Sequence, residues 1–246
     1  NVTPVNDAPV NTVPAAQTTL EDSPQVFSSG NGNAITVSDP DGASAPLTTT
    51  ISVTNGSFNA LTGGGATISG NGTGTVVISG TAAQINAALN GANYVNTPDY
   101  NGSALVTVST SDGIAPAVVN TVAVTVSPVV DITSDTLTTN EDTAISFNPI
   151  AGTNGATADS FEGSTPQITQ INGTNITAGG PAITVTNGTV SLGAGNILTF
   201  TPAANFNGTV PNFTYTVASG GVTETANITV NVTPVNDAPV NTVPAS

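Results

Sequence analysis

Carboxylates are the only side chains of this sequence that could serve as charged acid–base groups or ligands at neutral pH. The chain holds fifteen Asp and Glu residues and no Lys, Arg, His or Cys. Without His, Cys or Lys, a general base or a nucleophile would have to be a carboxylate, as in the paired acids of glycosidases. Those enzymes usually also offer aromatic platforms, whereas this chain has no Trp and three Tyr. The sequence therefore predicts a protein that is not an enzyme.

The lack of cationic side chains also limits where the acids can lie and what they can bind. Two carboxylates held about 4 Å apart near a protein surface repel each other by roughly 4 kcal/mol. A fold that gathers acids must leave them in solvent or take a cation from outside. The formal charge of −15 disfavours binding to nucleic acid and to anionic membranes. No apolar run is long enough to span a bilayer, so we expect neither nucleic acid nor direct membrane insertion.

The elements that must position these acids are predicted to be β-strands. Val, Ile and Thr alternate with polar residues in runs that end at Gly, Asn or Pro, as in 47–56, 104–113 and 226–234. This alternation is typical of half-buried strands. The Asn187-Gly188 pair between two alternating runs predicts a hairpin. The sequence therefore indicates an all-β chain.

One stretch departs from the β pattern, at residues 80–91. Its apolar residues recur with helical spacing, Thr81 can cap the first turn, and Gly91 can end the helix. The residues on the shared apolar face are Ala82, Ile85, Ala88 and Leu89. We expect a single short helix inside the first of two domains.

The same sixteen residues stand at both ends of the chain, except that Ala16 is replaced by Ser246. The two copies, 1–16 and 231–246, are offset by 230 residues, which is too long for a solenoid repeat and suits two ordinary domains of a tandem array. A related "PVVD" segment divides the interval. We predict two immunoglobulin-like β-sandwiches. Their boundaries are a linker at 1–7, sandwich A at 8–127, a linker at 128–131, sandwich B at 132–233, and a linker with the start of the next repeat at 234–246.

The two halves also align with each other. The Glu21-Asp22 pair matches Glu141-Asp142, and the next acids, Asp39 and Asp159, each follow the pair's Asp by 17 residues. "YVNTPDYNGS" in the first half corresponds to "FTPAANFNGT" in the second. The sandwiches are therefore expected to be divergent copies of one fold.

Together these motifs resemble the cadherin-like and bacterial immunoglobulin-like tandem repeats of giant secreted adhesins, including the RTX adhesins of Gram-negative bacteria. The shared features are the "PVNDAPV" linker, the following Glu-Asp, "DPDG" at 39–42, "TPxxNFNG" and a late "SDG", and they extend over essentially the whole chain. The resemblance implies extracellular, cell-surface arrays of immunoglobulin/cadherin-like sandwiches that Ca²⁺ makes rigid. Sandwich B departs from the pattern, with "ASGG" at 218–221 where sandwich A has "TSDG" at 110–113. We therefore expect unequal metal sites.

Strand alternation predicts where the acids meet. In a seven-stranded sandwich, the ends of strands gather at an N-terminal pole, where the chain enters, and at a C-terminal pole, where it leaves. We expect Glu21, Asp22 and Asp99 at the C-terminal pole of sandwich A beside the linker, and the "DPDG" acids with Asp112 at its N-terminal pole. Six to eight hard oxygen ligands suit Ca²⁺ rather than Zn²⁺ or Cu²⁺. The candidate ligands are Asn6, Asp7, Glu21, Asp22, Asp39, Asp41, Asp99, Asp112, Asp131, Glu141, Asp142, Asp159, Glu162, Asn236 and Asp237.

A simpler explanation competes at each of these positions. Asp and Asn next to Gly or Pro are common turn residues, because they tolerate left-handed backbone and cap turns. Asp135 and Glu224 are expected to be solvated surface acids. Asn-Gly-Ser/Thr sequons are interpreted as hairpin turns rather than glycosylation sites. The aromatic residues of the aligned motifs are expected in the core or at corners, namely Tyr94, Tyr100, Phe200, Phe206 and Tyr215.

The function that the sequence favours is that of a structural spacer in a large extracellular adhesin. A junction rebuilt at a fixed interval suits extension, with neighbouring repeats of the same chain as partners. The alternative is a subunit of a self-associating filament, sheath or surface layer, in which other copies of the chain are partners. A sugar- or ice-binding module is a third reading, disfavoured because the sequence has no short-period Thr array or aromatic cluster.

Overall fold

A computed structural model of the chain describes residues 5–42, 45–161 and 165–236. The chain separates into two compact units, unit 1 (Asn1–Val129) and unit 2 (Val130–Ser246). Each unit has a hydrophobic core of its own. The N-terminal pole of a unit is the end where its chain enters, and the C-terminal pole is the end where its chain leaves.

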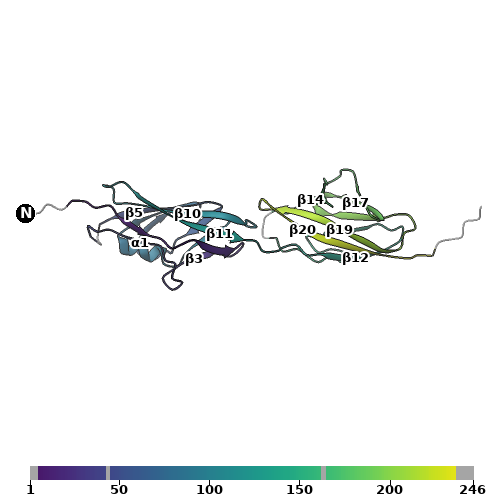
Figure 1. The fold of residues 1–246 in the computed structure, drawn as a ribbon, viewed down its shortest axis with the longest axis horizontal. Helices are drawn as coiled ribbons and strands as arrows, with labels where there is room; N and C mark the ends of the chain where they lie inside the picture. The colour runs from purple at the N-terminus through teal and green to yellow at the C-terminus, as the bar shows by residue number, and fades with distance from the viewer. Residues whose placement is uncertain (1–4, 43–44, 162–164, 237–246) are drawn as a thin grey trace, which may run out of the picture. The chain divides into compact units, whose positions relative to one another are not determined.

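The described residues of unit 1 form three antiparallel-rich sheets and one helix (Figure 1). The largest sheet has the order β2-β11-β10-β5-β8-β7, in which β2 runs parallel to β11 and the other neighbours are antiparallel. A second sheet has the order β3-β9-β6, and β1 pairs with β4. The elements are β1 Val10–Thr12, β2 Gln17–Leu20, β3 Gln25–Phe27, β4 Thr36–Ser38, β5 Leu47–Val53, β6 Gly56–Asn59, β7 Thr67–Ser69, β8 Thr75–Gly80, α1 Ala82–Leu89, β9 Ala92–Asn96, β10 Gly102–Ser111 and β11 Val118–Ser127.

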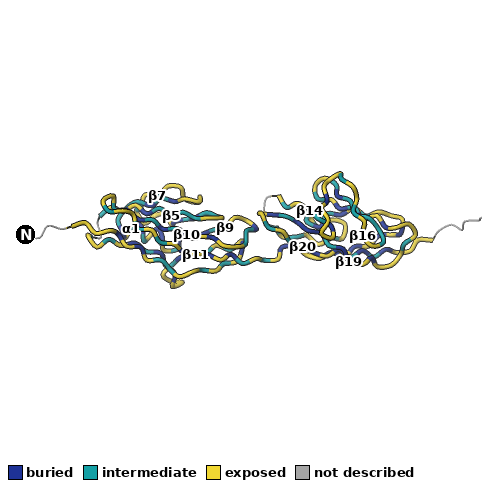
Figure 2. Tube along the Cα trace, turned by 45° about the horizontal axis from the view of Figure 1, so that its top comes forward, coloured by how far each residue is buried: buried dark blue, intermediate teal, exposed yellow. Residues whose placement is uncertain are grey.

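The core of unit 1 lies between its sheets because every second residue of the long strands is apolar. Along β10, Ala104, Val106 and Val108 are buried while the residues between them are not, an alternation visible along the strand in Figure 2. Phe27 of β3 and Phe58 of β6 stack with their ring centroids 6.3 Å apart. Residues from both sheets and from α1 thus form one continuous core.

The predicted helix is confirmed as α1. Its apolar face is buried and consists of Ala82, Ile85, Ala88 and Leu89. The Thr81 hydroxyl accepts a hydrogen bond from the Gln84 backbone N–H, and the Gln84 side chain accepts one from the Thr81 N–H. This reciprocal capping box satisfies two amide groups that the first helical turn leaves unpaired. Gly91 follows with a φ of 103°, a conformation that favours glycine.

The described residues of unit 2 form two sheets, with the orders β12-β20-β19-β14-β15 and β13-β18-β17-β16 (Figure 1). As in unit 1, the first strand of the larger sheet, β12, runs parallel to the last, β20. Phe200 and Phe213 stack across the core at 6.0 Å between ring centroids. The elements are β12 Asp135–Asn140, β13 Ile145–Phe147, β14 Gln167–Ile171, β15 Thr174–Asn175, β16 Ile183–Val185, β17 Gly188–Leu192, the 3₁₀ helix η1 Ala194–Asn196, β18 Leu198–Pro202, β19 Gly208–Ser219 and β20 Val222–Thr233.

The two units share a strand plan. In the order of their sheets, β2-β11-β10-β5 corresponds to β12-β20-β19-β14, and β3-β9-β6 corresponds to β13-β18-β17. The predicted hairpin is confirmed between β16 and β17, where Asn187 has a φ of 58°. Among the described residues, α1 is the one α-helix, and a 3₁₀ turn precedes β18 where α1 precedes β9. The all-β class with one short helix in the first unit is therefore confirmed.

Candidate functional site

The C-terminal pole of unit 1 is organised by the Glu21 carboxylate. Glu21 follows the end of β2, and its backbone N–H donates to the carbonyl of Ser127 at 2.9 Å, continuing the pairing of β2 with β11. Its carboxylate accepts hydrogen bonds from the backbone N–H of Val129 and, at 3.4 Å, from the side-chain amide of Asn101. The side chain is 2 % exposed. Glu21 therefore holds both the last residue of the unit and the loop that precedes β10.

Two aspartates lie beside each other at this pole. Asp22 and Asp99 both have positive φ, 61° and 55°, in the tight turns that Asp tolerates. The backbone N–H of Asp99 donates to Asp22 Oδ1 at 3.5 Å, and a carboxylate oxygen of each lies within 4.8 Å of the other. Asp99 is 1 % exposed. The structure thus brings together the three acids that the sequence assigned to this pole.

Unit 2 builds its C-terminal pole in the same way. The Glu141 N–H donates to the carbonyl of Thr233 at 2.8 Å, and the Glu141 carboxylate accepts from the backbone N–H of Val235 and from Asn207 Nδ2 at 3.1 Å. Asp142 has a φ of 58°, and its Oδ1 accepts from the backbone N–H of Asn205 at 3.0 Å. Asn205 therefore stands where unit 1 has Asp99. The pole keeps its hydrogen bonds and has one carboxylate fewer.

The N-terminal pole of unit 1 collects the acids of three separate segments. Asn6 Nδ2 donates to Asp112 Oδ2 at 2.8 Å, and the backbone N–H of Asp7 donates to Asp41 Oδ2 at 2.6 Å. Asp41 is tied to Asp39 by a hydrogen bond from its N–H to Asp39 Oδ1 at 2.9 Å. The hydrogen bond from Asn6, with those from nearby backbone N–H groups, lowers the pKa of Asp112. Asn6, Asp7 and Asp41 are exposed and the other two acids are half-buried, and the loops rather than the core position them.

The N-terminal pole of unit 2 also gathers acids. Glu224 Oε2 accepts hydrogen bonds from the backbone N–H groups of Asp131 and Ile132, at 3.0 and 3.1 Å. A carboxylate oxygen of Asp131 lies within 4.8 Å of one of Glu224. Asp159 Oδ1 accepts from the backbone N–H of Thr133 at 2.9 Å. Asp131 and Asp159, two of the candidate ligands, therefore lie at one pole of unit 2.

Asp135 and Glu224 correct the expectation that both are solvated surface acids. Asp135 is 2 % exposed, and Glu224 is half-buried with two backbone donors on one oxygen. Burial, together with the charge of Asp159, raises the pKa of Asp135 to about 6 against the stabilising N–H of Thr157. The sequence held the signal for Asp135. It begins the alternating run "DTLTTN", whose first, third and fifth residues face the core.

The remaining candidate ligands lie in or next to segments outside the described residues. Glu162 and Asp237 are not among the described residues, so the structure does not place them. Asn236 is exposed and directly follows Val235, whose N–H binds Glu141. Of the linker that follows unit 2, the structure therefore describes the residues up to Asn236.

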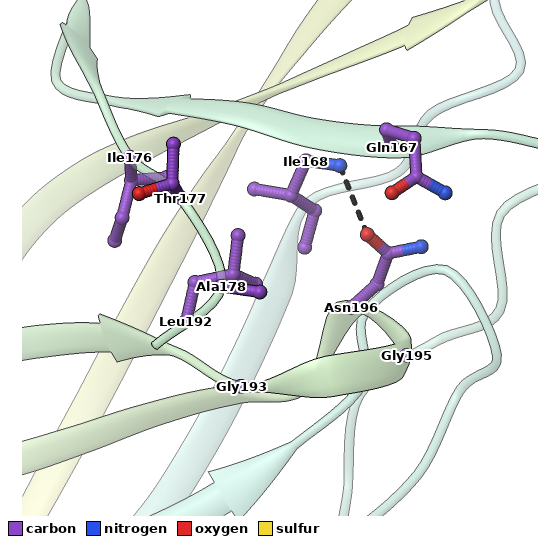
Figure 3. A pocket seen from close by; sticks show the side chains of 9 residues that line it. All are labelled: Gln167, Ile168, Ile176, Thr177, Ala178, Leu192, Gly193, Gly195 and Asn196. Carbon is purple, nitrogen blue, oxygen red and sulfur yellow. Dashed lines mark hydrogen bonds between the residues drawn. The ribbon is translucent and has the colours of Figure 1, made fainter. Parts of the chain in front are cut away.

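A pocket of about 240 Å³ lies in unit 2, away from these acids, between β14, β17 and η1 (Figure 3). Asn196 Oδ1 accepts from the Ile168 N–H at 3.1 Å, and its Nδ2 donates to the Pro166 carbonyl at 2.8 Å, so its amide is already used by the protein. None of the lining residues is charged, and they are Gln167, Ile168, Ile176, Thr177, Ala178, Leu192, Gly193, Gly195 and Asn196. This pocket offers no group for acid–base chemistry or for binding a charged ligand.

Comparison with known proteins supports the fold. Residues 125–231 match the family model of the bacterial Ig domain. No curated protein sequence matches the chain. No helix in the described parts of the chain has the length and apolar character needed to cross a membrane.

Several solved structures are similar to the chain at low sequence identity. They include an endo-fucoidan hydrolase of glycoside hydrolase family 107 (17 % identity, 93 % of this chain and 29 % of that chain, TM-score 0.31). The N-terminal Ig1-2 module of the Drosophila receptor protein tyrosine phosphatase DLAR (11 %, 92 % and 99 %, 0.26) and Drosophila N-cadherin EC1-3 (12 %, 94 % and 69 %, 0.30) are also similar. This chain thus spans 29 % of the length of the hydrolase chain.

The family match favours a non-catalytic structural or adhesion-type domain, and bacterial Ig domains are typically extracellular or at the cell surface. In each unit, residues from more than one sheet meet in a single core. Together with the match over 125–231, this architecture identifies an all-β protein of immunoglobulin-like sandwiches.

Proposed function

We propose that the two units are spacer repeats of a large extracellular adhesin, which Ca²⁺ at the linkers stiffens so that a binding region is projected from a bacterial cell. One observation carries the proposal. The same arrangement of a Glu, an Asp and an Asn around the departing chain is built twice, at the C-terminal pole of each unit. A device repeated at each exit of the chain serves the junctions of an array rather than a single substrate.

The donor set fits Ca²⁺. Every candidate ligand is a carboxylate or amide oxygen, and Ca²⁺ takes six to eight oxygen ligands at about 2.3–2.6 Å. Two oxygens on one such ion lie at most about 5 Å apart, which accommodates the Asp22 and Asp99 oxygens within 4.8 Å of each other. A bound cation would also remove their mutual repulsion, which no side chain of this protein can neutralise.

Chain connectivity explains how such an ion would act on the linker. The amide of Val129 is bound by Glu21, and Asp131 follows two residues later. A ligand contributed by Asp131 to the ion at Glu21, Asp22 and Asp99 would fix the residues between the units. Asp237 follows Val235 in the sequence by the same two residues, so the same spacing recurs after unit 2. Bound Ca²⁺ would then turn short flexible segments into rigid ones.

Small-angle X-ray scattering of the full chain tests the proposal. We expect a larger radius of gyration and a narrower distribution of conformations with Ca²⁺ than with EGTA. The Asp22→Asn/Asp99→Asn double variant, which keeps the side-chain shapes, should scatter alike in both buffers. Identical profiles of the unmodified chain with Ca²⁺ and with EGTA would refute the Ca²⁺-stiffened spacer. Electron microscopy of native material separates the alternative, because thin single strands fit a spacer and ordered thick fibres fit a self-associating filament.

A further inference from the structure

A buried carboxylate in unit 2 has one oxygen without a partner. Asp135 Oδ1 accepts a hydrogen bond from the Thr157 N–H at 2.6 Å, whereas Oδ2 has no hydrogen-bond partner. The side chain is 2 % exposed, so water cannot readily take that place. The other unpartnered buried side-chain atoms in the described part of the chain are amide oxygens, of Asn11, Asn96 and Asn120. Asp135 is thus the one carboxylate in this condition, and a buried charge costs far more than a buried amide.

The groups around Asp135 are also acidic. Asp159 is half-buried, and burial followed by the nearby charge of Glu224 raises its pKa against its own hydrogen bonds. Burial, and then the charges of Asp159 and Asp135, raise the pKa of Tyr215. The hydrogen bonds from the Thr133 N–H to Asp159 and from the Thr157 N–H to Asp135 also lay segment 133–135 beside segment 157–159, so the two carboxylates lie on neighbouring segments.

The Tyr215 hydroxyl is crowded by acceptors. It lies 3.0 Å from Asp159 Oδ2 and 3.0 Å from the carbonyl oxygen of Thr133. A hydroxyl has a single proton to donate, so it satisfies one of these oxygens at a time. Several oxygens thus converge here with fewer hydrogens than they could accept. An oxygen-rich, proton-poor, partly dehydrated place is what a hard cation requires.

We propose that Asp135 and Asp159, with the Tyr215 hydroxyl and the Thr133 carbonyl oxygen, form a cation site internal to unit 2 that takes a hard divalent ion of the Ca²⁺ type. This site goes beyond the linker sites of the proposed function and stands without them, because its residues all belong to one unit. The ion would provide the missing partner of Asp135 Oδ2. It would also supply the positive charge that fifteen acids and no cationic side chain leave absent.

Terbium luminescence provides a direct test on the full chain. Tb³⁺ binds oxygen sites like those of Ca²⁺ and emits when a nearby tyrosine is excited, and this chain has three Tyr and no Trp. We expect sensitised emission that Ca²⁺ displaces, that persists in Tyr100→Phe, and that loses most of its amplitude in Tyr215→Phe. Asp135→Asn should weaken Tb³⁺ binding at the Tyr215 site at least tenfold. The Asn side chain keeps an acceptor for the Thr157 N–H, so the variant should fold.

A control variant distinguishes this internal site from the cation site proposed at the linker. Asp99→Asn removes a proposed linker ligand and should leave the Tyr215-dependent emission unchanged, whatever it does to scattering. Ca²⁺ should also raise the melting temperature of unit 2 by more in the unmodified chain than in Asp135→Asn. Unchanged Tb³⁺ affinity in a folded Asp135→Asn variant would overturn the proposal and assign Asp135 a bound proton instead. Emission that millimolar Ca²⁺ does not displace would overturn it as well.

Discussion

The C-terminal poles of the two units share one backbone arrangement, and two of the differences between their sequences can be compared directly. In both, a Glu binds the departing chain and an Asp with positive φ accepts a backbone N–H. Where unit 1 has Asp99, however, unit 2 has Asn205, and both adopt a φ of 55°. Asp and Asn are equally suited to that turn. The turn therefore does not require the charge of Asp99. Charge is the property that distinguishes the two poles at this position, and under the proposed function that charge would bind Ca²⁺.

At the next position in the sequence, the two units differ by a hydroxyl group rather than by a charge. Tyr100 donates to the Ser103 carbonyl at 2.7 Å and accepts from Asn55 Nδ2 at 2.7 Å, whereas unit 2 has Phe206, which packs against the core without a hydroxyl. The two hydrogen bonds anchor the loop before β10 and have no counterpart through Phe206. The exchange of Tyr for Phe thus changes local stability, and the exchange of Asp for Asn changes charge.

The largest expected effect tests whether the two units, which share a strand plan, also unfold independently of each other. Phe58→Ala removes a fully buried ring that stacks on Phe27, and we expect it to lower the free energy of unfolding of unit 1 by about 3–5 kcal/mol. Phe213→Ala should do the same to unit 2. Calorimetry of each variant should show one shifted transition. A shift of both transitions by either variant would show that the two cores are coupled.

A smaller effect is expected in the pH dependence of the free energy of unfolding of unit 2. The pKa of Asp135 is raised to about 6, against about 3.9 for an unfolded Asp, so the folded state binds this proton more tightly. The contribution of Asp135 to the free energy of unfolding of unit 2 should then be largest below about pH 4 and fall by on the order of 2 kcal/mol as the pH rises through about 6. The raised pKa of Asp159 acts in the same direction.

Urea titrations between pH 4 and 7, in buffers stripped of divalent ions, would measure this fall. Asp135→Asn should remove most of it. Asp112→Asn is the matched control, because Asp112 lies in a loop at the pole of the other unit and its pKa is lowered rather than raised. A fall of equal size in Asp135→Asn would show that another group is responsible.

The charge difference between the C-terminal poles can be exchanged directly. Asp99→Asn gives unit 1 the side chain of unit 2, and we expect the tightest class of Ca²⁺ binding to weaken at least tenfold in isothermal titration calorimetry. Asn205→Asp is the reciprocal variant and should strengthen binding at unit 2. Equal affinities in all three chains would mean that this position is not a ligand.

The smallest expected effect concerns the loop anchored by Tyr100. Tyr100→Phe removes the hydroxyl that joins Asn55 to Ser103 and should cost unit 1 about 1 kcal/mol. Chemical denaturation would measure it. Ca²⁺ affinity should stay within twofold of the unmodified chain, because the hydroxyl is bonded within its own loop. A large loss of Ca²⁺ binding would instead make the loop anchor part of the metal site.

Much of the fold was predictable because it depends on short-range patterns. Alternation along residues 104–113 and 226–234 indicated the long strands β10 and β20, and helical spacing indicated α1 with its buried face. The Glu21-Asp22 and Glu141-Asp142 repeats located the two C-terminal poles. Turn chemistry and strand parity act over a few residues, so they can be recognised without knowing which strands pair.

The sequence by itself determined the absence of any cationic side chain, the all-β class, and the recurrence of acids at strand ends. Only the tertiary structure decided which acids lose their water. Asp135 and Asp112 are similar in sequence context, each near a Ser and a Thr, yet Asp135 is buried under the 157–159 segment and Asp112 is only half-buried in a loop. Burial depends on what a distant segment places over a side chain. Burial raises the pKa of a carboxylate and leaves its oxygens in need of a hydrogen-bond or cation partner. The tertiary structure, which brings distant segments together, therefore decided which carboxylate needs such a partner.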